Sequence, residues 1–164
     1  MRIECNVDGK ALSLTVNSIK PLSLILMENC DAPSLKTHCG GKHCGKCLVL
    51  FNDQAVLSCL VPAFRAKDAI ITTFDGFVRS RDYRDIEKAY ASTGFTPCQN
   101  CFGAQTLLIE SILRRYENND FPIDTEEILQ ESTLIKCHCI DSTGFLETVS
   151  AALVNRRKRH VRRT

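Results

Sequence analysis

The most informative stretch of this sequence is Cys39-Gly40-Gly41-Lys42-His43-Cys44-Gly45-Lys46-Cys47, which is followed after eleven further residues by Cys59. Three thiols spaced C-x4-C-x2-C, with a fourth further along the chain, are typical of the loop that binds a plant-type [2Fe–2S] cluster. Thiolates and bridging sulfides carry negative charge, so backbone N–H groups must converge on the sulfur atoms. Gly40, Gly41 and Gly45 permit this close approach and are expected to line the cofactor. A structural zinc site or a group of buried thiols is the alternative, although C-x4-C is an unusual zinc spacing.

A second set of thiols lies in the C-terminal half of the chain. It consists of a C-x2-C pair, Cys98 and Cys101, and a C-x-C pair, Cys137 and Cys139, separated by 35 residues. Both pairs adjoin predicted helix ends, and a thiol at a helix N-terminus has a lowered pKa, which favours the thiolate that binds metal. The gap is long for a zinc ribbon and C-x-C is a poor zinc corner. The pattern therefore favours a second [2Fe–2S] cluster and leaves a four-cysteine zinc site as the alternative.

The other residues capable of site chemistry do not form a recognisable constellation. Cys5 lies on the apolar face of a predicted strand, and Cys30 has no ligand position to fill, so both are interpreted as structural. His38, His43 and His138 each neighbour a predicted ligand, but none forms the C-x-H pair of a Rieske centre. No nucleophile–base arrangement and no phosphate-binding glycine loop is recognisable. We therefore predict no catalytic residue on this chain.

The N-terminal half is predicted to form a small mixed sheet. Alternating apolar residues at 2–7 and 12–16 flank Asp8-Gly9, which favours a tight hairpin turn. A second hairpin, of residues 48–51 with 55–60, would return Cys59 to the three earlier thiols. The remaining elements expected in this half are a helix at 22–29 and a strand at 69–74.

After Gly76 the strand patterns end and the apolar spacing becomes helical. Helices are expected around residues 83–90, over 103–116, from 124 onward and around 145–153. We therefore place a boundary near residues 76–82, with one domain at 1–77 and a small helical bundle at 82–154. Residues 155–164 are predicted to be a solvated, disordered basic tail.

The composition is that of a globular protein, with 24% charged and 44% hydrophobic residues. The last ten residues hold six of the 21 Lys and Arg residues, which leaves 15 basic against 19 acidic residues in the rest of the chain. The body is therefore mildly acidic, and the alternative to a solvated basic tail is a contact of this tail with nucleic acid or with the acidic face of a partner. No secretory signal and no membrane-spanning run is recognisable. Ten cysteines then indicate a reducing compartment, so a cytoplasmic location is predicted.

Both thiol sets, in this order, resemble those of the iron–sulfur subunit of the molybdenum hydroxylases, the xanthine dehydrogenase family. The resemblance extends from residue 1 to the last predicted helix. The run from Cys39 to Cys47 matches the family's binding loop, and Ser58-Cys59-Leu60 matches its returning cysteine. The family also has a second C-x2-C and a late C-x-C at the places of the second thiol set. All eight ligands are present: Cys39, Cys44, Cys47 and Cys59 for the first cluster, and Cys98, Cys101, Cys137 and Cys139 for the second.

This resemblance implies an α+β fold, in which an N-terminal β-grasp, plant-type ferredoxin-like domain precedes a C-terminal four-helix bundle. Each domain would hold one [2Fe–2S] cluster. The resemblance further implies an electron-transfer subunit of an oxidoreductase complex, with no substrate chemistry of its own. Its expected partners are a large subunit carrying the molybdenum cofactor and a subunit carrying FAD, with neither nucleic acid nor membrane among them.

The chain also departs from the family pattern. Pro97 stands where the family usually has a glutamine that reaches the pterin of the molybdenum cofactor, and His138 replaces an arginine between the late cysteines. Phe102-Gly103 replaces the customary Thr-Pro-Gly. Two alternatives to the subunit interpretation are a stand-alone ferredoxin-like electron carrier without a molybdenum partner and a zinc-stabilised interaction module.

Overall fold

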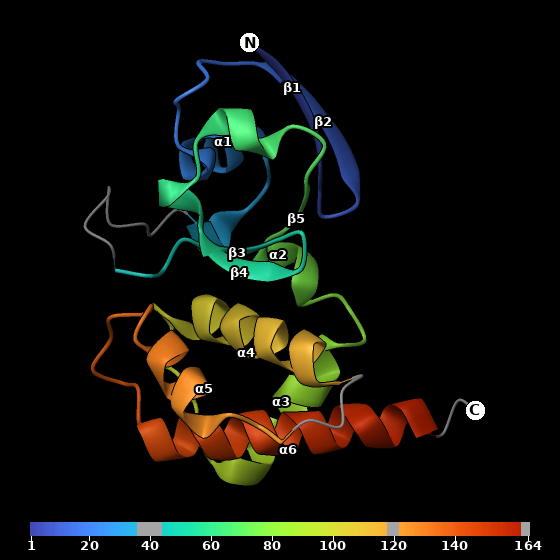
Figure 1. Cartoon of the computed structure of the whole chain (residues 1–164), viewed down its shortest axis with the longest axis vertical. Coiled ribbons are helices and arrows are strands. Elements are labelled where there is room, and N and C mark those ends of the chain that lie inside the picture. The colour runs from blue at the N-terminus through green and yellow to red at the C-terminus, as the bar shows by residue number, and fades with distance from the viewer. Residues whose placement is uncertain (36–43, 118–121, 162–164) are drawn as a thin grey trace.

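The computed structural model describes residues 1–35, 44–117 and 122–161 (Figure 1). These residues form a mixed α/β structure, with a five-stranded sheet in the first half and most of the helices in the second. The strands are β1 (Arg2–Val7), β2 (Lys10–Thr15), β3 (Leu48–Phe51), β4 (Gln54–Leu57) and β5 (Ile70–Thr72). The helices are α1 (Leu22–Asn29), α2 (Phe74–Phe77), α3 (Tyr83–Thr93), α4 (Phe102–Tyr116), α5 (Thr125–Ser132) and α6 (Ser142–Val161).

The first hairpin forms where the sequence predicts it. Asp8 and Gly9 both have positive φ values, of 53° and 82°, as a two-residue turn between antiparallel strands requires. The turn pairs Val7 with Lys10, and the Asn6 side chain accepts a hydrogen bond of 2.9 Å from the Gly9 amide. The predicted hairpin is confirmed.

The strand order in the sheet is β2-β1-β5-β3-β4, with β1 and β5 parallel and the other neighbours antiparallel. Successive residues of a strand point to opposite faces. In β3, Val49 therefore joins the core formed with α1, whereas Leu48 and Leu50 join the core formed with the helices of the second half. The sheet is covered on both faces at β3, which explains why this strand is an uninterrupted apolar run.

Helix α4 lies between the sheet and helices α3, α5 and α6 (Figure 1). Most of its side chains are buried, including a run of ten from Ala104 to Leu113. The turn between β3 and β4 is attached to α4 by an ion pair between Asp53 and Arg114. Next to it, the Ala55 amide donates a hydrogen bond of 3.0 Å to the Ser111 hydroxyl. The two halves of the chain therefore share one of the two cores, which contains Leu48 and Leu50 of β3 together with the buried residues of α4.

The C-terminal segment differs from its prediction. Helix α6 continues through Val161, and Arg156 is only 1% exposed because it fills a buried ion-pair network. Its guanidinium lies 2.6 Å from Glu110 of α4, 2.7 Å from Asp85 of α3 and 2.8 Å from Glu117. The prediction of a disordered tail at 155–164 is wrong for residues 155–161. Residues 162–164 lie outside the described part of the chain.

Two shorter segments also differ. The strand expected at 55–60 ends at Leu57, and Cys59 lies on a single 3-10 turn, Ser58–Leu60. The strand expected at 69–74 ends at Thr72, because the Thr73 side chain accepts a hydrogen bond from the Gly76 amide and caps the short helix α2. Among the helices of the described residues, we find no apolar segment of the length that a bilayer crossing requires.

Candidate metal centre

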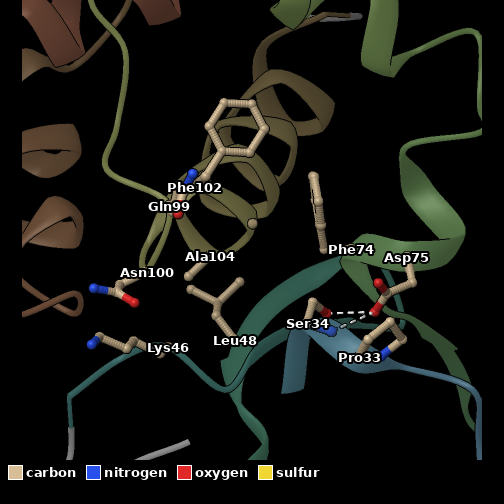
Figure 2. A pocket seen from close by; sticks show the side chains of 11 residues that line it. Pro33, Ser34, Lys46, Leu48, Phe74, Asp75, Gln99, Asn100, Phe102 and Ala104 are labelled. Carbon is tan, nitrogen blue, oxygen red and sulfur yellow. Dashed lines mark hydrogen bonds between the residues drawn. The ribbon is translucent and has the colours of Figure 1, made fainter. Parts of the chain in front are cut away.

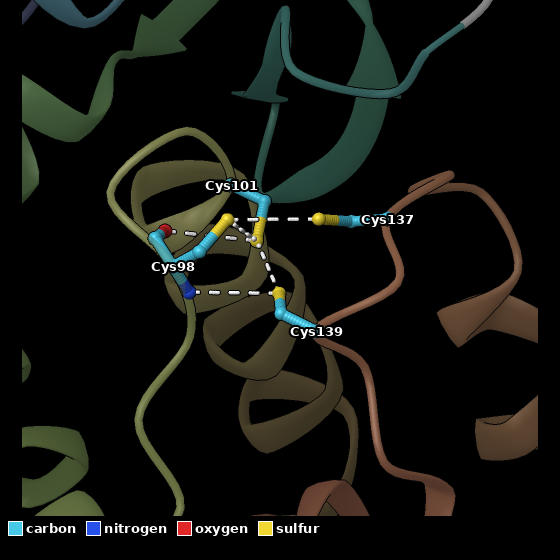
Figure 3. A group of neighbouring side chains, drawn as sticks. All are labelled: Cys98, Cys101, Cys137 and Cys139. Atoms are coloured by element: carbon cyan, nitrogen blue, oxygen red, sulfur yellow. Dashed lines mark hydrogen bonds between the residues drawn. The ribbon is translucent and has the colours of Figure 1, made fainter.

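Four thiols of the second half converge at one point, as Figure 3 shows. The Sγ atoms of Cys98, Cys101, Cys137 and Cys139 all lie within 4.8 Å of one another. The separation is 3.0 Å between Cys101 and Cys139, 3.4 Å between Cys98 and Cys101, and 3.6 Å between Cys98 and Cys137. Sequence segments 35 residues apart are thus brought together as the spacing predicts.

Local backbone structure places these thiols. Cys101 is the N-cap residue of α4, and the Cys98 carbonyl accepts hydrogen bonds from the amides of Cys101 and Phe102, at 3.1 and 2.9 Å. This turn directs the C-x2-C pair toward the segment between α5 and α6. That segment carries Cys137 and Cys139, and its turn is closed by a bond of 3.4 Å from the Ile140 amide to the Cys137 carbonyl.

The surroundings of the second thiol set shift the pKa values of its cysteines in different directions, downward for Cys98 and upward for Cys101 and Cys137. A hydrogen bond with the Cys101 thiol lowers the pKa of Cys98 to about 6, whereas burial raises the pKa of Cys101. The Cys98 amide points at the Cys139 sulfur from 3.5 Å. Burial raises the pKa of Cys5 and of Cys30 as well, so these two thiols stay protonated near neutral pH.

The donor set fits a metal group. Four thiolates around one zinc ion, each at about 2.3 Å from it, would lie about 3.8 Å apart at the corners of a tetrahedron. The four Sγ atoms, which all lie within 4.8 Å of one another, are grouped about as closely as a single zinc ion requires. A di-iron cluster contains two metal ions, so its two thiolate pairs must be further apart than the thiolates of a single ion. The geometry therefore establishes a group able to bind metal, and the choice between zinc and iron depends on other observations.

The first thiol set is described only in part. Cys39, Gly40 and Gly41 lie outside the described residues, as do His38 and His43. The other three cysteines are described: Cys47 is buried, and Cys44 and Cys59 are half-buried.

The β3–β4 hairpin brings Cys59 to the start of β3. The amide and the hydroxyl of Ser58 both donate to the Cys47 carbonyl, at 3.1 and 2.6 Å, directly beyond the last residue pair of the hairpin. Cys59 therefore follows at the end of the metal-binding loop. The first ligand set remains a prediction.

The two thiol sets are in contact through the backbone. The Lys136 amide donates a hydrogen bond of 3.0 Å to the Cys44 carbonyl, and Lys136 directly precedes Cys137. Gly45, which follows Cys44, has a φ of 83°. A Cβ atom on Gly45 would lie 2.3 Å from the Leu134 carbonyl oxygen. Only a glycine allows the loop to approach this segment so closely.

We expect Gly45→Ala to be more destabilising than Gly9→Ala, although both glycines have φ values near 80°. Left-handed backbone costs an alanine about 1–2 kcal/mol at either position. At Gly9 no atom lies within 4 Å of the added methyl group, whereas at Gly45 the methyl meets backbone. Overpacking of this kind adds about 1–3 kcal/mol. Denaturant unfolding of both variants measures the difference, and equal losses would contradict the close contact.

A pocket of about 420 Å³ lies between the sheet and the start of α4, as Figure 2 shows. Gln99 and Asn100, from the loop between Cys98 and Cys101, lie on one side, and Lys46 approaches from the first metal-binding loop. On the opposite side, Asp75 accepts hydrogen bonds from the amide and the hydroxyl of Ser34. A concave, mostly apolar surface therefore adjoins both thiol sets.

No protein-family model matches the chain. It is 28% identical over 149 residues to the nicotinate dehydrogenase small FeS subunit of Eubacterium barkeri, covering 91% of this chain and 90% of that protein. It is also 28% identical over 151 residues to the xanthine dehydrogenase iron-sulfur-binding subunit of Escherichia coli O157:H7, covering 92% and 91%. The chain resembles the iron–sulfur subunits of the xanthine dehydrogenase family. The resemblance predicted from the two thiol sets is thus confirmed.

Solved structures support the same fold. Quinoline 2-oxidoreductase from Pseudomonas putida 86 is 20% identical with a TM-score of 0.73, and the match covers 96% of both chains. Aldehyde oxidoreductase from Desulfovibrio gigas is 21% identical with a TM-score of 0.76, covering 94% of this chain and 17% of that one. The curated relatives are subunits of dehydrogenases, and the predicted role as a subunit of an oxidoreductase is thereby confirmed.

The prediction from sequence missed two residues of this xanthine dehydrogenase-like subunit. Lys136 connects the two thiol sets through the hydrogen bond of its backbone amide to Cys44, and no sequence pattern predicts a backbone contact of this kind. Gln105 points its side-chain amide at the sulfurs of Cys101 and Cys139. A polar residue four positions after a predicted ligand, in an otherwise apolar helix face, was the available signal for Gln105.

Proposed function

We propose that this chain is an electron-transfer subunit with two [2Fe–2S] clusters, one on each thiol set. In this proposal it relays electrons from a subunit carrying the molybdenum cofactor to a subunit carrying FAD, within a xanthine dehydrogenase-like hydroxylase. The sheet half corresponds to a β-grasp, ferredoxin-like domain at 1–77. Helices α3 to α6 correspond to the four-helix bundle of the second domain, and α6 extends this domain beyond the limit of 154.

The observation that carries the proposal is the contact between the two thiol sets. From Cys137 the covalent chain leads through the Lys136 amide, across one hydrogen bond of 3.0 Å, to the carbonyl of Cys44. Residues predicted to ligate separate metal groups are thus connected by a short path with a single non-covalent step. A chain whose metal sites were purely structural would have no need for this connection.

The residues around the second thiol set suit the transfer of electrons. Iron–sulfur clusters supply one-electron chemistry when bound, with potentials set by burial and hydrogen bonds to sulfur. Cys101 is fully buried, and the Cys98 amide and the Gln105 side chain are directed at the sulfurs. No nucleophile–base pair has been recognised in the sequence. Substrate chemistry and the flavin are accordingly assigned to partner subunits.

Metal analysis tests the proposal. We expect the complex, purified without oxygen, to be coloured and to contain iron and acid-labile sulfide in the equal amounts that two [2Fe–2S] clusters per chain require, together with molybdenum and FAD. Iron and sulfide sufficient for only one cluster would contradict the two-cluster proposal. A colourless preparation with zinc and no labile sulfide would overturn it.

A zinc site at the second thiol set is the second candidate, because all four sulfurs lie within 4.8 Å of one another. In that case the chain would be a zinc-stabilised interaction module, and the metal analysis above identifies it. Pro97 favours a third possibility, a stand-alone ferredoxin-like carrier, because proline has no side-chain amide with which to reach a pterin. Copurification of a large subunit with this chain distinguishes the carrier from the subunit.

A further inference from the structure

Gln105 is a buried polar residue with an unusual set of partners. It lies on α4, is 0% exposed, and directs its side-chain nitrogen toward two sulfur atoms. Nε2 lies 3.3 Å from the Cys101 sulfur and 3.7 Å from the Cys139 sulfur. One side-chain amide thus contacts both pairs of the second thiol set, the C-x2-C pair and the C-x-C pair.

The orientation of this amide follows from the chemistry of its neighbours. A thiolate accepts hydrogen bonds and donates none, so the NH2 side of the amide must face the two sulfurs. The oxygen Oε1 then points away, and it is the only buried side-chain N or O atom without a hydrogen-bond partner among the residues that the structure describes. Leaving a buried carbonyl oxygen unpaired is destabilising. The unpaired Oε1 of Gln105 therefore destabilises the fold, whereas the Nε2 of the same amide donates hydrogen bonds to the two sulfurs.

We infer that Gln105 raises the reduction potential of the metal group held by the second thiol set, by donating hydrogen bonds to the sulfurs of Cys101 and Cys139. The inference rests on the proposed function, in which this group is a [2Fe–2S] cluster. Each added electron increases the negative charge shared by the sulfurs, so an N–H donor stabilises the reduced form more than the oxidised one. Gln105 is in this sense a positioning residue of the electron relay and not a metal ligand.

Gln105→Leu tests the inference because leucine has similar bulk and no donor. We expect the equilibrium constant for one-electron reduction of the second cluster to fall about tenfold, which corresponds to about 59 mV. The measurement is an EPR-monitored redox titration of the complete complex. In the same titration the first cluster is an internal reference, and its potential should not move.

The stability of the variant separates this role from a structural one. Leucine removes the unpaired Oε1 together with the donor, so we expect Gln105→Leu to unfold at the same temperature as the wild type or at a higher one. A residue needed only for packing would give the opposite result, a lower unfolding temperature with an unchanged potential. That combination would overturn the inference.

Thr106→Val is the matched control. Thr106 is the next residue of α4, is equally buried, and bonds to Tyr90 and to the Phe102 carbonyl instead of to sulfur. We expect the reduction potential of the second cluster in Thr106→Val to equal that of the wild type. A second readout is the hyperfine signal of the exchangeable amide protons near the reduced cluster, compared in H2O and D2O, which Gln105→Leu should diminish.

The outcomes keep the two proposals apart. If the wild-type complex holds no iron at the second thiol set, the proposed function fails. If the wild type holds two clusters and Gln105→Leu leaves both potentials unchanged, the role of Gln105 is refuted while the proposed function stands.

Discussion

Cys98→Ser is expected to remove the iron of the second thiol set and to leave the first cluster intact. The reduced wild-type complex should show two distinct EPR signals, and this variant should lose one of them together with half of its iron. The physical reason is that Cys98 lies within 3.6 Å of two other thiols of the group, and its pKa, lowered to about 6, makes it a ready thiolate. A serine hydroxyl remains protonated and is a poor ligand for iron–sulfur clusters.

Cys44→Ser is the complementary change, and we expect it to remove the other signal. Cys30→Ser is the matched control, because Cys30 is also half-buried but burial raises its pKa and no ligand role is assigned to it. Both signals should persist in the control. If Cys98→Ser kept its full iron content, or Cys30→Ser lost a cluster, the assignment of ligands would be wrong.

Arg156→Met should be the most destabilising single substitution outside the thiol sets. The methionine removes the positive charge that Asp85 and Glu110 share in the core, where both carboxylates are almost fully buried. Breaking a buried ion pair from one side costs about 3–5 kcal/mol. Each carboxylate loses one partner and keeps another, because Arg159 still pairs with Asp85 and Arg114 still pairs with Glu110. For a chain of this size we expect the midpoint of thermal unfolding to fall by roughly 10 °C.

Two further variants test the mechanism of that loss. Lys158→Met removes the same charge from an exposed position of α6, and its effect should stay within about 0.5 kcal/mol. In the Arg156→Met background, Glu110→Gln should recover part of the stability, because it removes one of the buried charges that Arg156 no longer neutralises, although Glu110 still pairs with Arg114. The absence of any recovery would show that the loss comes from packing rather than from charge.

Local elements of the fold could be predicted because local sequence determines them. Asp8-Gly9 gives a tight turn wherever it joins two alternating strands, and the apolar spacing of residues 22–29 and 103–116 matches α1 and α4 closely. The four thiols of the second set are also brought together as their spacing suggests. Backbone preference and side-chain periodicity act over a few residues, so they remain visible in the sequence.

The structure of the C-terminal segment could not be predicted in this way. Arg156 and its basic neighbours resemble a solvated tail, because charged residues are seldom buried without partners. The partners exist, but Asp85 and Glu110 lie 71 and 46 positions earlier in the chain. Only the packing of α6 against α3 and α4 brings these charges together. A prediction from local composition therefore fails at this segment.

The resemblance of both thiol sets to one subunit family could be inferred from the cysteine spacings, because a metal ligand must be a particular residue type at a particular interval. The contact between the sets arises only in the folded chain. The hydrogen bond from Lys136 to Cys44 and the bonds from Gln105 to two sulfurs depend on where the halves pack and where an amide points. Packing in the shared core around α4 determines those positions, and residue spacing in the sequence does not predict them.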